Sequence, residues 1–266
     1  INQKSIVIDE IKSTTKNLDS FNKEENSVHW GQVKIYAYIY AKQNHLECIE
    51  AQLTYAQSDT GETREFRKRF TLKELELFFE DLLARFLKWA ETIEKWKHER
   101  DKSIQQITFP YKTYRSGQQE MIQEVYSSIL QGNQLMVEAP TGIGKTMATI
   151  FPAIKCVGEG RIDKFFFLTA KTTGRLIAQE TIGDLRAQGL KFKSITLTAK
   201  EKICFNPEFS CNGEECEYAK GFFDRINEAV EVLYQQDALS REIIETTAKR
   251  YRVCPFEFSL ELSLWA

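Results

Sequence analysis

A short glycine-rich segment carries the residue types that bind a nucleotide phosphate. It reads Ala139-Pro-Thr-Gly-Ile-Gly-Lys-Thr146, with alanine where the usual pattern has its first glycine. In such a loop, backbone N–H groups and the start of the next helix face the phosphate. Lys145 would neutralise the β- and γ-oxygens, and the Thr146 hydroxyl would bind Mg²⁺. The predicted phosphate-binding residues are Thr141, Gly142, Ile143, Gly144, Lys145 and Thr146.

Cysteines form a second group of residues that could do chemistry, as ligands of a metal or cluster. Four of the six lie in the last quarter of the chain, and these are Cys204, Cys211, Cys216 and Cys254. Zinc sites usually contain cysteine pairs with roughly two to four intervening residues, and only Cys211 and Cys216 come near this. A [4Fe–4S] cluster needs four thiolates and tolerates long gaps. Spacing alone therefore leaves zinc and iron–sulfur open, whereas Cys48 and Cys156 lie in apolar surroundings and are interpreted as core residues.

The elements of the first hundred residues follow from the spacing of apolar side chains. Thr71 with Glu74 forms a capping box, which indicates a helix start. The pattern predicts a strand at 6–12, a helix at 28–43, strands at 49–55 and up to about residue 70, and a helix from 71 to about residue 100. On the first strand, Glu10 and Lys12 share one face because successive side chains alternate.

After a polar segment at 101–113, interpreted as a linker, strands alternate with helices. The predicted elements are helix 116–131, strand 135–138, loop 139–144, helix 145–155, strand 165–169, helix 175–188 and strand 194–197. Gly132 is a C-cap signal for the first of these helices. The alternation is typical of a parallel α/β sheet, and it puts the glycine-rich loop between a strand and a helix, as phosphate binding requires. An ordinary loop beside a surface lysine is the alternative interpretation.

Composition excludes several classes of protein. The chain has 266 residues, 36 Lys+Arg against 38 Asp+Glu, and 42% hydrophobic residues. These values suit a globular chain of one or two domains and argue against a disordered, collagenous or membrane protein. The balanced charge neither indicates nor excludes nucleic acid. With no apolar run near ~20 residues and no secretory signal, we expect a cytoplasmic protein. We also expect that the chain, which opens on Ile1, lacks its natural beginning.

The phosphate loop and the segment before it resemble a known helicase group. The sequence Glu138-Ala-Pro-Thr-Gly-Ile-Gly-Lys-Thr146 looks like the first motif of superfamily 2 helicases. Upstream, Tyr114-Arg-Ser-Gly-Gln-Gln-Glu-Met121 resembles an element of the XPD/DinG group of iron–sulfur DNA helicases. This resemblance implies that ATP is the nucleotide, with Arg115 and Gln118 on its adenine side. Leu168-Thr-Ala-Lys-Thr172 is similar to the next motif of the family, which touches the DNA backbone.

The same resemblance favours iron–sulfur over zinc. Helicases of this group carry a four-cysteine iron–sulfur domain inserted in the motor sheet. Thr198-Ala-Lys-Glu-Lys-Ile-Cys204 and Val253-Cys-Pro-Phe-Glu257 look like the flanks of that domain. The resemblance implies that the four cysteines of the last quarter hold a [4Fe–4S] cluster beside the pore for single-stranded DNA.

The front of the chain resembles PD-(D/E)xK nucleases of the RecB/Cas4 type. Glu10-Ile-Lys12 and Gln32-Val-Lys-Ile-Tyr36 are similar to two of their motifs. The resemblance implies catalytic roles for Glu10, Lys12, Gln32 and Tyr36, in a site where carboxylates hold Mg²⁺ and the lysine activates water. The metal-binding Asp of that family has no counterpart, since Asp9 faces away from Glu10. We therefore expect this chain not to cut DNA.

The expected fold is α/β, with a partial P-loop (RecA-like) parallel sheet, a helical four-cysteine insertion, and a partial α+β PD-(D/E)xK-like domain in front. The expected domains are 1–100 nuclease-like, 101–113 linker, 114–199 motor, 200–256 iron–sulfur, and 257–266 returning to the motor. The implied function is an ATP-dependent DNA helicase that moves 5′ to 3′ on single-stranded DNA and opens forked DNA, in DNA repair or replication. Two alternatives stay open: a DNA-binding module with an inactive nuclease-like fold, and an unrelated P-loop NTPase with a zinc-binding insertion.

Overall fold

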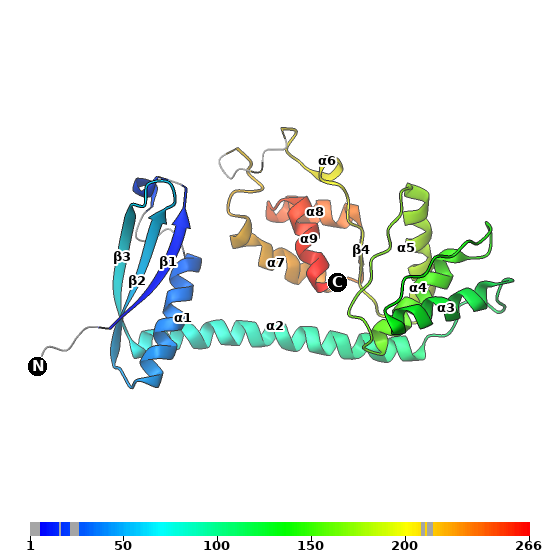
Figure 1. Ribbon diagram of the computed structural model, residues 1–266, viewed down its shortest axis with the longest axis horizontal. Coiled ribbons are helices and arrows are strands. Elements are labelled where there is room, and N and C mark those ends of the chain that lie inside the picture. Colours follow the sequence, from blue (N-terminus) through cyan, green and yellow to red (C-terminus); the bar gives the residue numbers. More distant parts are fainter. Residues whose placement is uncertain (1–5, 16, 22–26, 209–210, 212–214) are drawn as a thin grey trace, which may run out of the picture. The chain divides into compact units, whose positions relative to one another are not determined.

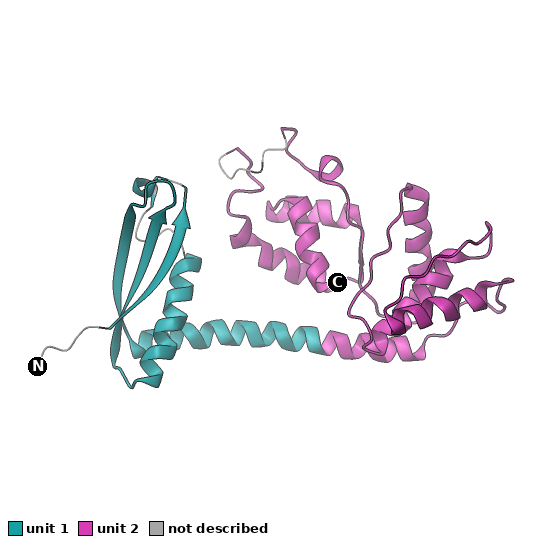
Figure 2. Cartoon of the chain, viewed as in Figure 1, with its two compact units in different colours: residues 1–94 teal, residues 95–266 magenta. Residues whose placement is uncertain are grey.

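The computed structural model of the chain describes residues 6–15, 17–21, 27–208, 211 and 215–266. The chain forms two compact units, unit 1 at residues 1–94 and unit 2 at residues 95–266 (Figure 2). The division falls inside one helix, α2 (Leu72–Gln106). This helix continues past residue 100 into the segment interpreted from sequence as a linker. None of the helices in the described residues is both long enough and apolar enough to cross a bilayer.

Unit 1 is a three-stranded sheet with a helix on one face (Figure 1). Its elements are β1 (Val7–Thr14), the 3₁₀ turn η1 (Leu18–Ser20), α1 (Ser27–Gln43), β2 (Cys48–Gln57), β3 (Thr63–Thr71) and the first part of α2. β1 pairs with β2 in parallel, and β2 pairs with β3 in antiparallel orientation. Parallel neighbours need a crossover connection, and α1 supplies it. The strands and the helix predicted for this region are confirmed.

The core of unit 1 lies between α1 and the sheet. Val33, Ala37 and Ala41 of α1 are fully buried, and so is Ala51 of β2. The other buried members are Leu18, Trp30, Tyr38, Ile49, Leu53, Tyr55, Phe66 and Leu75. The alternation of β2 explains this composition, since every second residue of a strand points to the same face of the sheet.

The capping box predicted at the start of α2 is present. The backbone N–H and the hydroxyl of Thr71 both donate to Oε2 of Glu74 at 2.8 Å, and the N–H of Glu74 donates to Oγ1 of Thr71 at 3.3 Å. These bonds lower the pKa of Glu74. The reciprocal bonds satisfy donors that a helix start leaves without intrahelical partners.

Unit 2 is mainly helical in its described residues. Its elements are the end of α2, α3 (Gln118–Gln131), α4 (Lys145–Gly158), α5 (Thr172–Ala187), β4 (Ser194–Ile195), α6 (Lys200–Ile203), α7 (Phe222–Tyr234), β5 (Ala238–Leu239), α8 (Arg241–Tyr251) and α9 (Pro255–Trp265). β4 and β5 pair in parallel. The three helices predicted at 116–131, 145–155 and 175–188 are confirmed, and Gly132 ends α3 with φ +66°, as its C-cap signal predicts.

One core of unit 2 forms where α4 and α5 meet the end of α2. Ile150, Ile154 and Leu185 are buried there with Ile104. The packing is close, because a Cβ placed on Gly158 of α4 would lie 2.5 Å from Cγ2 of Ile104. This core fixes α4, and with it the loop that precedes the helix.

The parallel sheet predicted for unit 2 is largely not formed. Segments 135–138 and 165–169 are not strands, and the predicted strand 194–197 is reduced to Ser194–Ile195. The apolar side chains of these segments lie open, with Met136 97% and Leu168 88% exposed. An apolar run becomes a strand only where a neighbouring strand pairs with its backbone and another layer covers its face. The described residues of unit 2 therefore form a mainly helical unit with one two-stranded sheet, β4-β5.

Candidate functional site

The glycine-rich loop leads directly into α4. Gly142 and Gly144 have φ values of +88° and +82°, a conformation that glycine adopts without the steric cost of a Cβ. Gly144 is the N-cap, so the helix begins at Lys145 with its first backbone N–H groups directed back toward the loop. In the predicted set, Thr141, Gly142 and Lys145 are exposed, and Ile143, Gly144 and Thr146 are half-buried. Helix-start donors beside an exposed lysine suit an anionic phosphate.

The ammonium group of Lys145 folds over its own loop. Its Nζ donates to the carbonyl oxygens of Ala139 at 3.1 Å and Pro140 at 2.8 Å. Phosphate oxygens can replace these neutral acceptors, because charge-assisted hydrogen bonds are stronger. Thr146 follows Lys145 in the first turn of α4, so its hydroxyl belongs to the same end of the helix. The residues therefore fit a nucleotide phosphate with Mg²⁺.

Segment 115–118 contacts the loop directly. Arg115 donates from Nη1 to the carbonyl oxygen of Gly142. Gln118 is only 2% exposed, and its Nε2 donates to the carbonyl oxygen of Gly144 at 3.3 Å. Its Oε1 accepts from the backbone N–H of Arg115 at 3.1 Å. The two residues predicted to lie on the adenine side thus both hold the phosphate loop in this structure.

The contact between this segment and the loop includes a residue that the sequence pattern did not single out. Gly117 has φ +75°, and a Cβ on it would lie 3.1 Å from Cδ1 of Ile143. A Cβ on Gly144 would lie 2.2 Å from Nε2 of Gln118. The available signal was a glycine in the first turn of the helix predicted at 116–131, since glycine adopts a left-handed backbone without steric cost.

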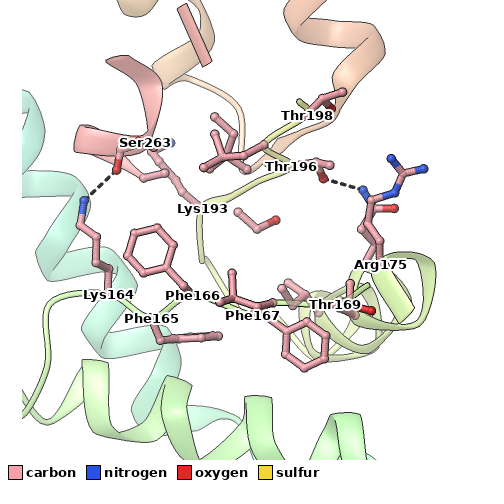
Figure 3. Close-up of a pocket in the computed structure, with 18 of the residues that line it drawn as sticks. Lys164, Phe165, Phe166, Phe167, Thr169, Arg175, Lys193, Thr196, Thr198 and Ser263 are labelled. Carbon is pink, nitrogen blue, oxygen red and sulfur yellow. Dashed lines mark hydrogen bonds between the residues drawn. The ribbon is translucent and has the colours of Figure 1, made fainter. Parts of the chain in front are cut away.

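Segment 168–172, predicted to contact DNA, borders a cavity of about 460 Å³ (Figure 3). The opposite wall is formed by segment 192–199. Gln179 of α5 donates to Oγ1 of Thr196 at 2.9 Å and joins the two walls. Lys164 donates to the carbonyl oxygen of Ser263 at 2.7 Å and brings the end of α9 to the rim. Phe165, Phe166 and Phe167 contribute three aromatic side chains to the lining.

A buried lysine anchors one side of this cavity. The side chain of Lys193 is 2% exposed, and its Nζ lies 4.8 Å from the ring centre of Trp96 and 4.4 Å from that of Tyr234. It donates to the carbonyl oxygen of Gln236 at 3.0 Å and lies 3.7 Å from a carboxylate oxygen of Asp237. Burial lowers the pKa of Lys193. No sequence pattern indicated this cluster, because its members are far apart along the chain.

The four predicted cluster ligands lie at the ends of helices and in loops. Cys204 follows α6 and is half-buried, Cys254 is the buried N-cap of α9, Cys216 is buried and Cys211 is exposed. In the part of the chain that the structure describes, no three His, Cys, Asp or Glu side chains come close enough together to hold a metal ion. The residues between Cys204 and Cys216 are described only in part.

Lys200 interacts electrostatically with three of these thiols. Its Nζ donates to Sγ of Cys211 at 2.7 Å. This bond raises the pKa of Lys200, and the charges of Cys211, Cys204 and Cys254 add to the rise. Burial raises the pKa of the Cys254 thiol. Thiol sulfurs are the ligands that soft metals and iron–sulfur clusters prefer, so the chemistry of the four cysteines fits such a group. In the described residues, however, the cysteines are not close enough together to form a ligand shell.

In unit 1, Glu10 and Lys12 lie on the face of the sheet that α1 covers. Nζ of Lys12 is 2.7 Å from Oε1 of Glu10, and their side chains are 27% and 18% exposed, respectively. Asp9 lies on the other face, where its carboxylate accepts from Oγ1 of Thr54 at 2.8 Å and from Nε2 of Gln52 at 3.0 Å. The expectation that Asp9 faces away from Glu10 is therefore confirmed.

His29 of α1 belongs to the same group, although the sequence gave no reason to choose it. Burial lowers the pKa of His29, the charge of Lys12 lowers it further, and Glu10 opposes them. Nδ1 of His29 shares a hydrogen bond of 2.8 Å with the hydroxyl of Tyr55, the residue paired with Lys12 across the strands. A lone histidine carries no sequence signal of its own.

The two helix residues of the nuclease-like motif lie along α1. Gln32 and Tyr36 follow His29 by one and two turns, so the three share a helix face. Gln32 is half-buried, and Tyr36 is 51% exposed. The helix therefore directs the predicted pair to the same flank as His29, beside the buried stripe that contacts the sheet.

Comparison with known proteins bears on unit 2. Residues 115–201 match the family model of DEAD/DEAH box helicases, a span that begins at Arg115 and includes the phosphate loop. Over 46 residues, the chain is 44% identical to a protein of Methanocaldococcus jannaschii described as a probable ATP-dependent helicase. That alignment covers 17% of this chain and 7% of the relative, so the chain matches only a small part of it. No solved structure gives a significant match. Residues 115–201, which contain the phosphate loop, are therefore similar in sequence to DEAD/DEAH box helicases.

Proposed function

We propose that this chain is part of an ATP-dependent DNA helicase of the XPD/DinG-like iron–sulfur type. The observation that carries the proposal is the phosphate loop held by Arg115 and Gln118, within the span that matches DEAD/DEAH box helicases. The loop and the upstream segment are separate motifs of the helicase resemblance, and they contact each other through two hydrogen bonds. The proposed partners are ATP, single-stranded DNA and forked DNA, with movement 5′ to 3′ in DNA repair or replication.

The residues of the loop have distinct tasks in this proposal. Backbone N–H groups at the start of α4 bind the phosphates, and Lys145 exchanges the carbonyl oxygens of Ala139 and Pro140 for phosphate oxygens. Thr146 would hold Mg²⁺, which would offset the negative charge of the phosphates. Because Gln118 bonds both Arg115 and Gly144, a ligand that moves the segment also moves the loop.

Stimulation of ATP hydrolysis by DNA tests the motor proposal. In the full-length protein, single-stranded DNA should raise the hydrolysis rate, and Lys145→Ala should abolish activity because the phosphates lose their main cation. Lys112→Ala, at another exposed lysine of unit 2, is the matched control and should retain the stimulated rate. Hydrolysis that does not respond to single strands would favour the unrelated P-loop NTPase.

The four cysteines are proposed to hold a [4Fe–4S] cluster. The proposal is supported by the chemistry of the four thiols and by the 2.7 Å hydrogen bond between Lys200 and Cys211, and it includes Cys204, Cys216 and Cys254. The purified full-length protein should be brown and contain iron and acid-labile sulfide. Cys216→Ser should lose both, whereas Cys156→Ser, in the core of α4, should keep them. Stoichiometric zinc without iron would exclude the cluster and support the zinc alternative.

Unit 1 is proposed to be a nuclease-like domain that binds DNA without cutting it. The ion pair between Glu10 and Lys12, next to His29, supports the first part of this proposal. In the described residues, no three His, Cys, Asp or Glu side chains come together around Glu10 to hold a metal ion, and Asp9 lies on the opposite face of the sheet. Incubation of this chain with single-stranded DNA and Mg²⁺ or Mn²⁺ should give no cleavage. Cleavage that disappears in Lys12→Ala would instead demonstrate a functional nuclease site.

A further inference from the structure

A row of cations and aromatic rings lies on β3 and α1 of unit 1. Arg64, Phe66, Lys68 and Phe70 alternate along β3, so all four point to the same face of the sheet. The pairing with β2 confirms this face, because Phe66 is opposite the core residue Leu53. We name this row, together with Lys34 of α1, the cation row. The acidic residue of β3, Glu65, lies on the opposite face with Arg67 and Arg69.

Each cation of the row lies over an aromatic ring. Nζ of Lys68 is 4.7 Å from the ring centre of Trp30, and Cζ of Arg64 is 5.4 Å from that of Phe66. Nζ of Lys34 is 5.5 Å and 4.7 Å from the ring centres of two rings, Phe70 and Phe78. A cation over a ring is attracted by the negative face of the π system. The rings therefore restrict the positions of the charges.

The charges of the row are poorly compensated. In the part of the chain that the structure describes, no carboxylate lies within ion-pair distance of Lys34 or Lys68. Arg64 has one acidic neighbour, Asp19, at 3.5 Å, and the side chain of Asp19 is 94% exposed. Nearby acids are engaged elsewhere, since Glu76 pairs with Lys42. The row thus presents fixed positive charge in a protein whose net charge is −2.

Protection of a sheet edge is the simpler explanation for charge on β3, which is one of the two edge strands of the described sheet. Charged side chains on an edge strand discourage pairing with other chains. Charges of either sign serve that purpose, and they need not be held over rings. β3 instead carries four basic residues and one acidic residue. Charge of one sign in fixed positions is a feature of surfaces that bind a polyanion.

We propose that the cation row binds the phosphate backbone of single-stranded nucleic acid. Holding Lys34 and Lys68 over rings reduces the rotamer entropy that they would lose on binding phosphate. Trp30 and Phe66 are buried, so bases have no access to their faces, and the contact is to the backbone and independent of base sequence. This surface is distinct from the Glu10–Lys12 pair and from the phosphate loop. It deepens the proposed function, on whose nucleic-acid partner it rests.

Salt dependence of binding provides the test. A fluorescent oligo-dT probe is titrated with the 266-residue chain, without nucleotide, at several salt concentrations. Each phosphate contact to a single strand contributes about −0.7 to the slope of log K against log salt. Lys34→Gln with Lys68→Gln should therefore make the slope shallower by about 1.4 and weaken binding about 25-fold at 0.1 M salt. Lys34→Arg with Lys68→Arg should retain binding.

A matched double variant controls for overall charge. Lys88→Gln with Lys95→Gln removes two exposed lysines of α2 and should leave slope and affinity nearly unchanged. Equal losses in the two double glutamine variants would overturn the proposal, because they would indicate a diffuse charge effect. Tighter binding of polyglutamate than of oligo-dT would also overturn it, in favour of an acidic protein partner.

A measurement on the unmodified chain covers the case in which the variants fail to fold. Amine acetylation with and without oligo-dT, followed by mass spectrometry, should show protection of Lys34 and Lys68 but not of Lys88 and Lys95. If oligo-dT binds but does not protect Lys34 and Lys68, the proposal that the cation row binds nucleic acid is wrong, and the proposed function is unaffected. Absence of any oligo-dT binding would remove the nucleic-acid partner itself.

Discussion

Apolar strand-like segments behave differently in the two units. In unit 1, Leu53 and Tyr55 of β2 are 2% and 3% exposed, with a strand on each side and α1 across the face. In unit 2, Met136 and Leu168 are 97% and 88% exposed, and their segments pair with no strand in the described residues. Apolar residues alternate with polar ones in β2 and form continuous runs at 135–137 and 165–168. The difference shows that an apolar segment has only a tendency to form a strand. The strand forms where a neighbouring strand pairs with its backbone and another element covers its face.

The same truncation in the two segments should give the largest difference. Leu53→Ala removes buried atoms from the centre of the sheet and should lower the free energy of unfolding by about 2–5 kcal/mol. Leu168→Ala removes atoms that already contact water and should change it by less than about 0.5 kcal/mol. Urea denaturation followed by circular dichroism measures both. Similar losses for the two variants would mean that segment 165–169 is covered in solution.

A second contrast lies within the phosphate loop. Gly144→Ala puts a side chain on a residue with a left-handed backbone, and its Cβ would lie 2.2 Å from Nε2 of the buried Gln118. It should lower the free energy of unfolding by about 2–4 kcal/mol. Gly142→Ala has the same backbone problem but no atom within 4 Å of its Cβ, and should cost about 1–2 kcal/mol. Thermal unfolding and nucleotide binding report on both variants.

Removal of the clashing side chain sharpens this test. In the Gly144→Ala background, Gln118→Ala should restore part of the lost stability, since the Cβ then has room. Additive losses in the double variant would mean that Gln118 does not pack on Gly144. Such a result would contradict the contact on which the proposed function depends.

The parts of the molecule that could be predicted from sequence are those set by local spacing. The capping box at Thr71, the Gly132 cap, and the loop from Ala139 to Thr146 each depend on residues within about two helical turns. Their signals are therefore contained in short stretches of sequence. The confirmed strands of unit 1 had a clear alternation, and β2 pairs with β3, the next strand along the chain.

The features that escaped prediction depend on contacts between distant residues. His29 and Tyr55 are 26 positions apart, and Lys193 and Tyr234 are 41 positions apart. Nothing in the spacing of either pair indicates a contact. The strand predicted at 135–138 failed for the related reason that strand formation depends on a partner strand, which an apolar run alone does not identify.

Helix caps offer a smaller comparison between the units. Thr71 exchanges two side-chain bonds with Glu74, whereas Ser240 accepts one bond of 3.4 Å from the N–H of Ile243. Thr71→Ala should therefore lower the free energy of unfolding by about 1 kcal/mol, and Ser240→Ala should lower it by about 0.5 kcal/mol. Chemical denaturation of both variants gives these values. A larger loss for Ser240→Ala would contradict the ranking based on hydrogen-bond geometry.

The smallest expected effect concerns the acid sensitivity of unit 1. Burial and the charge of Lys12 lower the pKa of His29 from its ordinary value of 6.5, so the folded state binds a proton less readily than the unfolded state. Stability from this source is complete above pH 6.5 and is lost as the pH falls through the lowered pKa. Urea unfolding at pH 7 and pH 5 should show a smaller acid loss in His29→Gln than in the unmodified chain. Because α1 holds His29 beside Lys12 only when β1 and β2 are paired, an equal loss in both proteins would mean that this face of unit 1 is open to solvent. In that case the sheet of unit 1 would resemble the uncovered segments of unit 2 more closely than its buried core indicates.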